Sequence, residues 1–127
     1  MSEKQKKIAV LEDDMAMREI ITQKLSKSGF VVKVAQDGES GIVLIEKEKP
    51  DTILMDIMMP GMDGYEVLKR LRSNKDKKLA ATPVFILSNL WSREDKVKAD
   101  KYKVVDYLVK AYFTPDQIVA KVRAKLV

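Results

Sequence analysis

The sequence predicts an α/β fold, a doubly wound sheet of five parallel strands with five helices. Two observations lead to this prediction. Short apolar runs rich in β-branched residues alternate with longer segments that have helical spacing, and each parallel strand pair needs such a crossover. The chain has 127 residues, which suits one domain over residues 1–127.

The expected elements follow one another along the chain without a linker or repeat. The expected strands are 8–11, 30–35, 53–57, 84–87 and 104–109. The expected helices cover about 14–27, about 39–49, and the stretches that follow positions 64, 92 and 114. Gly29 and Pro50 end the first two helices, and Thr114 to Gln117 supplies an N-cap, a proline and a capping-box Gln for the last. The expected inward residues are Ile20, Ile21, Leu25, Ile42, Leu44, Ile45, Val67, Leu68, Leu71, Val119, Val122 and Leu126.

The composition excludes several kinds of site. The chain has neither Cys nor His, so a disulfide framework, a thiol nucleophile and an imidazole base are all excluded, and any metal must be held by oxygen. The N-terminus has too few apolar residues for a signal peptide, and no run is long enough to span a membrane. A cytoplasmic location and no membrane contact are therefore expected.

A basic cluster accounts for the net charge of +5. The ten residues from Lys69 to Lys78 hold six basic residues and one Asp. Such a cluster could meet nucleic acid or an acidic protein surface. It lacks interleaved aromatic residues and contains Asp76, so a solvated helix end and loop is favoured, and direct nucleic-acid binding is not expected.

Polar side chains follow four of the five expected strands. Glu12 and Asp13 follow the first, Asp56 lies at the end of the third, Ser88 lies at the end of the fourth, and Lys110 follows the fifth. In doubly wound sheets these strand ends meet at a crevice where ligands bind. Converging carboxylates need a cation, and an oxygen-only site of this kind suits Mg²⁺.

This inventory of groups is typical of a site that binds a phosphoryl group with its metal. Each residue also has a plainer explanation. Asp14 is better explained as a helix cap, Lys110 could be a surface lysine with a buried stem, and Ser88 could be a loop hydroxyl. Asp56 has apolar residues on both sides, which makes a purely solvating role hard to accept.

In these residues the chain resembles the receiver domains of two-component response regulators, the chemotaxis-regulator-like family. The stretch "LMDIMMPGMDG" carries the resemblance together with Glu12-Asp13, Ser88, Tyr107 and Lys110, over the whole chain, 1–127. The resemblance implies a flavodoxin-like strand order of 2-1-3-4-5. It implies Asp56 as the phosphoryl acceptor and Lys110 as its partner. Ser88 and Tyr107 would form the switch, and the Mg²⁺ ligands would be Glu12, Asp13, Asp56 and the backbone carbonyl of Met58.

The resemblance also implies partners and a mode of action. A histidine kinase or phosphotransfer protein would donate the phosphoryl group, and the face formed by the fourth helix, fifth strand and fifth helix would then control a downstream protein or a fused effector. The chain would be a signalling module rather than an enzyme, although it would assist its own phosphorylation and dephosphorylation. Asp106 and Arg123 could pair across a phosphorylation-dependent homodimer.

Two alternatives stay open: a Mg²⁺-dependent phosphatase or nuclease, and a degenerate receiver that only binds a partner. Phosphatases and nucleases of this kind tend to carry a second acid two residues after the first. Counted from Asp56, that position in this chain is Met58. Ala111 stands where the family usually has a cis proline, so the geometry of the Lys110–Ala111 peptide is open. Asn89 is larger than the family's usual residue, and Trp91 is expected to report on the switch by its fluorescence. The cognate kinase, the output and the oligomeric state are not readable from the sequence.

Overall fold

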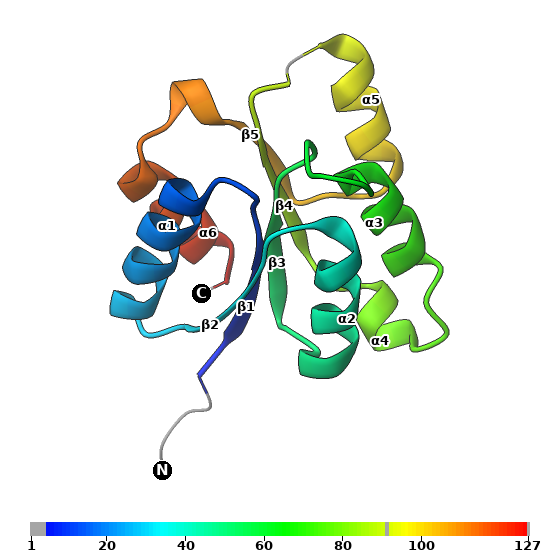
Figure 1. The fold of residues 1–127 in the computed structure, drawn as a ribbon, viewed down its shortest axis with the longest axis horizontal. Coiled ribbons are helices and arrows are strands. Elements are labelled where there is room, and N and C mark those ends of the chain that lie inside the picture. The colour runs from blue at the N-terminus through cyan, green and yellow to red at the C-terminus, as the bar shows by residue number, and fades with distance from the viewer. Residues whose placement is uncertain (1–4, 91, 127) are drawn as a thin grey trace.

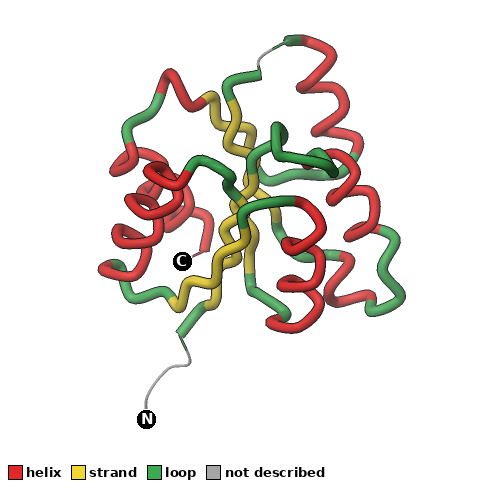
Figure 2. Tube along the Cα trace, in the orientation of Figure 1, coloured by secondary structure: helices red, strands yellow, loops and turns green. Residues whose placement is uncertain are grey.

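The computed structural model of the chain describes residues 5–90 and 92–126, which form one parallel sheet between two layers of helices (Figures 1 and 2). The strands are β1 Lys7–Leu11, β2 Val31–Ala35, β3 Thr52–Met55, β4 Val84–Ser88 and β5 Asp106–Val109. The helices are α1 Met15–Lys27, α2 Gly38–Glu48, α3 Gly64–Arg72, α4 Lys77–Ala80, α5 Arg93–Lys101, the 3₁₀ turn η1 Lys110–Tyr112, and α6 Pro115–Leu126. No helix within these ranges is long and apolar enough to cross a membrane.

The strand order is β2-β1-β3-β4-β5 with every neighbouring pair parallel, as predicted. In the register, Leu11 of β1 lies opposite Ala35 of β2 on one side and Met55 of β3 on the other. The last residues of β1 and β3 are therefore side by side at the carboxyl edge of the sheet. The segments that follow β1 and β3 therefore begin next to each other at this edge.

Each face of the sheet has its own apolar core, because side chains alternate along a strand. Ile8 and Val10 of β1 pack with α1 and α6, while Ala9 and Leu11 pack with the helices of the opposite face. Figure 1 shows α1 and α6 on one side of the sheet and α2, α3, α4 and α5 on the other. The two cores together fix the ends of β1 and β3.

The helices begin at side-chain caps. Asp14 accepts a hydrogen bond from the backbone N–H of Met17, which confirms its predicted role as the cap of α1. The predicted capping box of α6 is also present, since Thr114 Oγ1 accepts from the N–H of Gln117 and the Gln117 side chain accepts from the N–H of Thr114.

The structure corrects the predicted helices in three places. The described chain has six α-helices instead of five, because the short α4, capped by Asp76, forms within the basic cluster. Ile20 was expected to face the core but is 40% exposed, since α1 turns only Ile21 and Leu25 fully inward. On α6, Ile118 is buried although it was not among the expected inward residues.

Arg72 differs most clearly from the prediction that the basic cluster is a solvated helix end and loop. Its guanidinium donates to three backbone carbonyls, those of Tyr102 at 2.8 Å, Ala80 at 2.9 Å and Thr82 at 2.7 Å. Burial lowers the pKa of Arg72 from its usual value. This side chain therefore joins α3 to the chain after α4 and to the end of α5.

Candidate functional site

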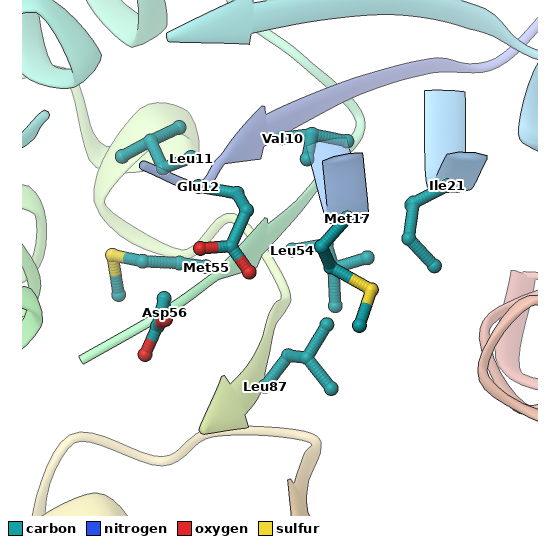
Figure 3. Close-up of a pocket in the computed structure, with 9 residues that line it drawn as sticks. All are labelled: Val10, Leu11, Glu12, Met17, Ile21, Leu54, Met55, Asp56 and Leu87. Carbon is teal, nitrogen blue, oxygen red and sulfur yellow. The ribbon is translucent and has the colours of Figure 1, made fainter. Parts of the chain in front are cut away.

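Glu12 and Asp56 are held at the carboxyl edge of the sheet by backbone hydrogen bonds that continue the strand ladder. The N–H of Glu12 donates to the carbonyl of Ala35, and the N–H of Asp56 donates to the carbonyl of Leu11, both at 3.0 Å. The two carboxylates come from the ends of β1 and β3 and lie near each other, as Figure 3 shows. They are only 3% and 5% exposed.

Lys110 lies between these two carboxylates. Its Nζ is 2.6 Å from Glu12 Oε1 and 2.6 Å from Asp56 Oδ2, and its side chain is 13% exposed. The explanation of Lys110 as a surface lysine is therefore wrong. No cis peptide occurs in the described part of the chain, so the Lys110–Ala111 bond is trans, and Lys110 still reaches Asp56.

The charges in this site perturb one another. Burial raises the pKa of Glu12 to about 7, and the neighbouring charge of Asp56 adds to this increase while Lys110 opposes it. Burial lowers the pKa of Lys110, but its hydrogen bonds and charge interactions with Asp56 and Glu12 outweigh burial and raise the pKa overall. One ammonium thus balances part of an acidic cluster that has more negative charge than it can neutralise.

The acidic cluster has the donor set of a divalent metal site. Glu12, Asp13 and Asp56 each offer a carboxylate oxygen, and these oxygens lie within 4.8 Å of one another. Buried Glu12 Oε1 is paired with the Lys110 ammonium at 2.6 Å. An all-oxygen cluster of three carboxylates with one ammonium fits a hard cation such as Mg²⁺.

The turn after β3 orients the second oxygen of Asp56. The N–H of Met58 donates to Asp56 Oδ1 at 3.0 Å, while Met58 itself is 59% exposed. Gly64 packs tightly below this turn, because a Cβ there would lie 2.7 Å from the Asp56 carbonyl oxygen. The predicted role of the Met58 carbonyl as a metal ligand stays a prediction.

Ser88 and Tyr107 lie on the neighbouring strands β4 and β5. Ser88 is fully buried and its Oγ accepts a hydrogen bond from the N–H of Leu90 at 3.1 Å. The Tyr107 hydroxyl donates to the carbonyl of Leu90 at 2.6 Å, so the half-buried ring is directed inward. Both predicted switch residues thus contact the same loop residue. Trp91, the predicted fluorescent reporter, lies outside the described residues.

A small void lies among core side chains next to Glu12 and Asp56. Its volume is about 10 Å³, room for about one water molecule. The residues that line it are Val10, Leu11, Glu12, Met17, Ile21, Leu54, Met55, Asp56 and Leu87 (Figure 3). Most of these are core side chains, so a ligand would meet Glu12 and Asp56 from the open edge of the sheet.

Sequence reasoning missed two groups near the site. Arg18 of α1 donates to the carbonyl of Glu12 at 2.9 Å and so fixes the acidic turn from below. Tyr65 of α3 bonds to Asp95 of α5, close to the loop that Ser88 and Tyr107 contact. Arg18 lies one turn into a helix that follows the acidic residues, which is a weak signal. Nothing in the sequence links Tyr65 to a residue 30 positions away.

Comparison with known proteins gives one consistent result. The profile of the family described as "Response regulator receiver domain" matches residues 8–123. The chain is 39% identical over 120 residues to the transcriptional regulatory protein HprR of Escherichia coli, covering 94% of this chain and 51% of that protein. It thus spans about half the length of the curated relatives it matches.

Two solved structures have the same fold. The chemotaxis protein CheY4 of Vibrio cholerae superimposes with a TM-score of 0.86 at 26% identity, covering 95% of this chain and 98% of that one. The BeF3-activated receiver domain of RstA from Klebsiella pneumoniae gives a TM-score of 0.82 at 31% identity, covering 94% of this chain and 97% of that one.

Proposed function

The chain belongs to the response regulator receiver domain family of two-component signalling, and from this we propose that Asp56 is the residue that accepts the phosphoryl group. One observation carries the proposal. Asp56 is buried at a strand end, its two oxygens are oriented by Lys110 and by the Met58 N–H, and Asp13 and Glu12 add further carboxylate oxygens beside it.

In the proposed reaction, an Asp56 oxygen attacks the phosphorus of a phosphohistidine on the donor protein. The new P–O bond forms as the P–N bond breaks, and the electron pair returns to the imidazole nitrogen, which takes a proton from solvent. Lys110, already 2.6 Å from Asp56 Oδ2, would neutralise charge on the phosphoryl oxygens. Ser88, whose oxygen accepts from the N–H of Leu90, would donate its O–H to one of them.

A Mg²⁺ ion would be held by Glu12, Asp13 and Asp56, with the carbonyl of Met58 as the remaining protein ligand. When bound, it supplies positive charge that offsets the negative charge of the phosphoryl group. The chain's own contribution is to hold the carboxylates together, and Lys110 alone cannot balance three of them. Phosphorylation and dephosphorylation assisted by the chain itself are part of this proposal.

The proposed donor is a histidine kinase or phosphotransfer protein in the cytoplasm. The proposed output is the face formed by α5, β5 and α6, which would act on a downstream protein or on an effector in the same polypeptide. Relatives of about twice this length are named transcriptional regulators, which supports the second version. A homodimer on this face could pair Asp106 with Arg123, worth about 0–1 kcal/mol if exposed.

The test is a phosphoryl group on Asp56. Incubation with acetyl phosphate and Mg²⁺ should raise the intact mass by one phosphoryl group, and Asp56→Asn should remain unmodified. Chelation of Mg²⁺ should prevent the modification as well. Asp51→Asn is a matched control, because Asp51 lies at the opposite edge and bonds to the Lys7 N–H. An unmodified wild-type protein would contradict the proposal.

The dimer version has its own measurement. Sedimentation velocity of the protein with beryllofluoride and Mg²⁺, the mimic used for the similar RstA receiver, should show a dimer that Arg123→Glu prevents. A monomer under these conditions would leave only the version with a different partner protein.

A further inference from the structure

Two hydrogen-bonded pairs near the start of α5 are not used in the proposed phosphoryl chemistry. One joins Tyr65 of α3 to Asp95 of α5, and the other joins Tyr107 of β5 to Leu90. The Tyr65 hydroxyl lies 3.2 Å from both the backbone carbonyl and Oδ1 of Asp95. The Tyr107 hydroxyl donates to the carbonyl of Leu90 at 2.6 Å.

Asp95 is held from its other side by the cap of α5. Ser92 Oγ donates to Asp95 Oδ2 at 2.7 Å and accepts from the Asp95 N–H at 3.1 Å. Tyr65 therefore holds the first turn of α5 against α3. Lys98, one turn further along α5, lies 5.2 Å from the centre of the Tyr65 ring and adds a second contact.

The two tyrosines influence each other electrostatically. Burial raises the pKa of Tyr65 well above its usual value, and Tyr107 and Asp95 raise it further. Burial also raises the pKa of Tyr107, and the charge of Asp95 contributes. Each hydroxyl has its hydrogen bond with a different residue, and both rings pack against the same apolar core.

We propose that Tyr65 is a positioning residue of the switch, whose hydroxyl holds the first turn of α5 so that Tyr107 stays on the Leu90 carbonyl. Tyr65, Leu90 and Tyr107 pack against the same apolar core. Leu90 donates its N–H to Ser88 and accepts from Tyr107, so a shift of the loop changes both bonds. The inference rests on the proposed function, because Ser88 is the group proposed to meet the phosphoryl oxygens.

The expected consequence is that removing the Tyr65 hydroxyl weakens binding of a phosphoryl mimic. In Tyr65→Phe, part of the binding free energy goes into ordering a loop that the wild type already holds. Loss of one ordinary hydrogen bond corresponds to about a three- to tenfold weaker apparent affinity for beryllofluoride in the presence of Mg²⁺. Tyr102→Phe is the matched control, since Tyr102 also packs on this core, at the far end of α5.

The experiment combines a beryllofluoride titration with NMR of the tyrosine rings. Tyr65→Phe should weaken binding and shift the Tyr107 ring signals in the ligand-free protein, and Tyr65→Phe with Tyr107→Phe should lose less than the sum of the two single losses. Tyr102→Phe should change neither. Unchanged affinity and unchanged Tyr107 signals in Tyr65→Phe, or equal effects in Tyr102→Phe, would overturn the inference.

Failure of the proposed function gives a different result. If wild-type protein binds no beryllofluoride, or Asp56→Asn binds it equally well, the phosphoryl site is wrong. The ligand-free Tyr107 signals then still decide whether Tyr65 positions that ring.

Discussion

Lys110 determines the electrostatics of the site more than any other single residue. Its ammonium touches two carboxylates that would otherwise repel each other in a largely buried crevice. A buried charge that loses its partner is strongly disfavoured, so each member of this trio depends on the others. The residue that pairs with Asp56 in the unphosphorylated chain is also the one proposed to pair with the phosphoryl group.

The lifetime of the phosphoryl group depends on residues at the rim. Hydrolysis needs a water molecule held in line with the bond to Asp56, and the side chains that follow the site are Met58, Asn89 and Leu90. Met58 and Leu90 cannot orient water, so the phosphoryl group should persist for minutes or longer. Met58→Asn should shorten this by about tenfold or more, the effect of one orienting hydrogen bond.

Intact mass followed after removal of the donor measures this lifetime. Met58→Leu is the control and should leave the decay unchanged, and Asn89→Ala should slow it if the Asn89 amide orients water. Loss of the phosphoryl group within seconds in the wild type would contradict the prediction.

The sequence predicted which residues gather at the site because the ends of parallel strands share one edge. Glu12, Asp56 and Lys110 needed only their places after β1, β3 and β5. The bond of Tyr65 to Asp95 was not predictable, because it depends on how α3 and α5 pack. The short α4 was missed for a related reason, since four residues in a charged stretch carry no helical periodicity.

At the scale of elements, both ends of α3 are fixed by contacts with backbone groups of other segments. Its first residue, Gly64, lies against the Asp56 carbonyl and the Cα of Ile57, and its last residue, Arg72, binds three carbonyls of other segments. α3 therefore connects the turn after Asp56 with the opposite edge of the molecule. A substitution of Arg72 should therefore affect the stability of the fold, whereas a substitution of Gly64 should affect the site as well.

Arg72→Met should lower the free energy of unfolding by about 2–4 kcal/mol, because three partly buried carbonyls lose a charged donor. Arg70→Met is a matched control on the same helix. The Arg70 side chain is exposed and pairs with Glu66 at 3.6 Å, so its loss should change stability by about 0.5 kcal/mol or less. Urea unfolding of both variants measures the difference, and equal losses would refute the role of Arg72.

Gly64→Ala should disturb the site as well as the fold. The added Cβ would lie 2.7 Å from the Asp56 carbonyl oxygen and 2.9 Å from Ile57 Cα, so the backbone must move. We expect a loss of about 1–3 kcal/mol in stability and slower phosphorylation of Asp56. Gly29→Ala is the comparison. There φ is +97° with open space around it, so strain should cost about 1–2 kcal/mol without changing the phosphorylation rate.

At the scale of the whole molecule, function and folding lie at opposite edges of the sheet. The acidic cluster, Ser88 and Lys110 meet at the carboxyl edge, while Arg72 and the ion pair of Lys7 with Glu48 join the segments at the amino edge.

Carboxylates outside the site also support the fold. The pKa of Asp37, which caps α2, is lowered by its hydrogen bonds with Ser40, and the pKa of Glu48 is lowered mainly by its hydrogen bond with Lys7.

These lowered pKa values predict the direction of acid unfolding. A carboxyl group with a lower pKa in the folded state adds stability above its usual pKa, near 4, and this stability is lost as the pH falls through the folded-state value. The urea midpoint should therefore fall from pH 5 to pH 3. Asp37→Asn keeps a good cap but cannot titrate, so its midpoint should fall less steeply over this range. An identical slope would contradict the prediction for Asp37.

The separate cores on the two faces of the sheet have a consequence for protein engineering. α5 packs in one core and α6 in the other, and between them β5 sends Tyr107 to the first and Leu108 to the second. The segment from the β4–α5 connection through α5 could therefore be exchanged for that of another receiver without repacking α1 and α6.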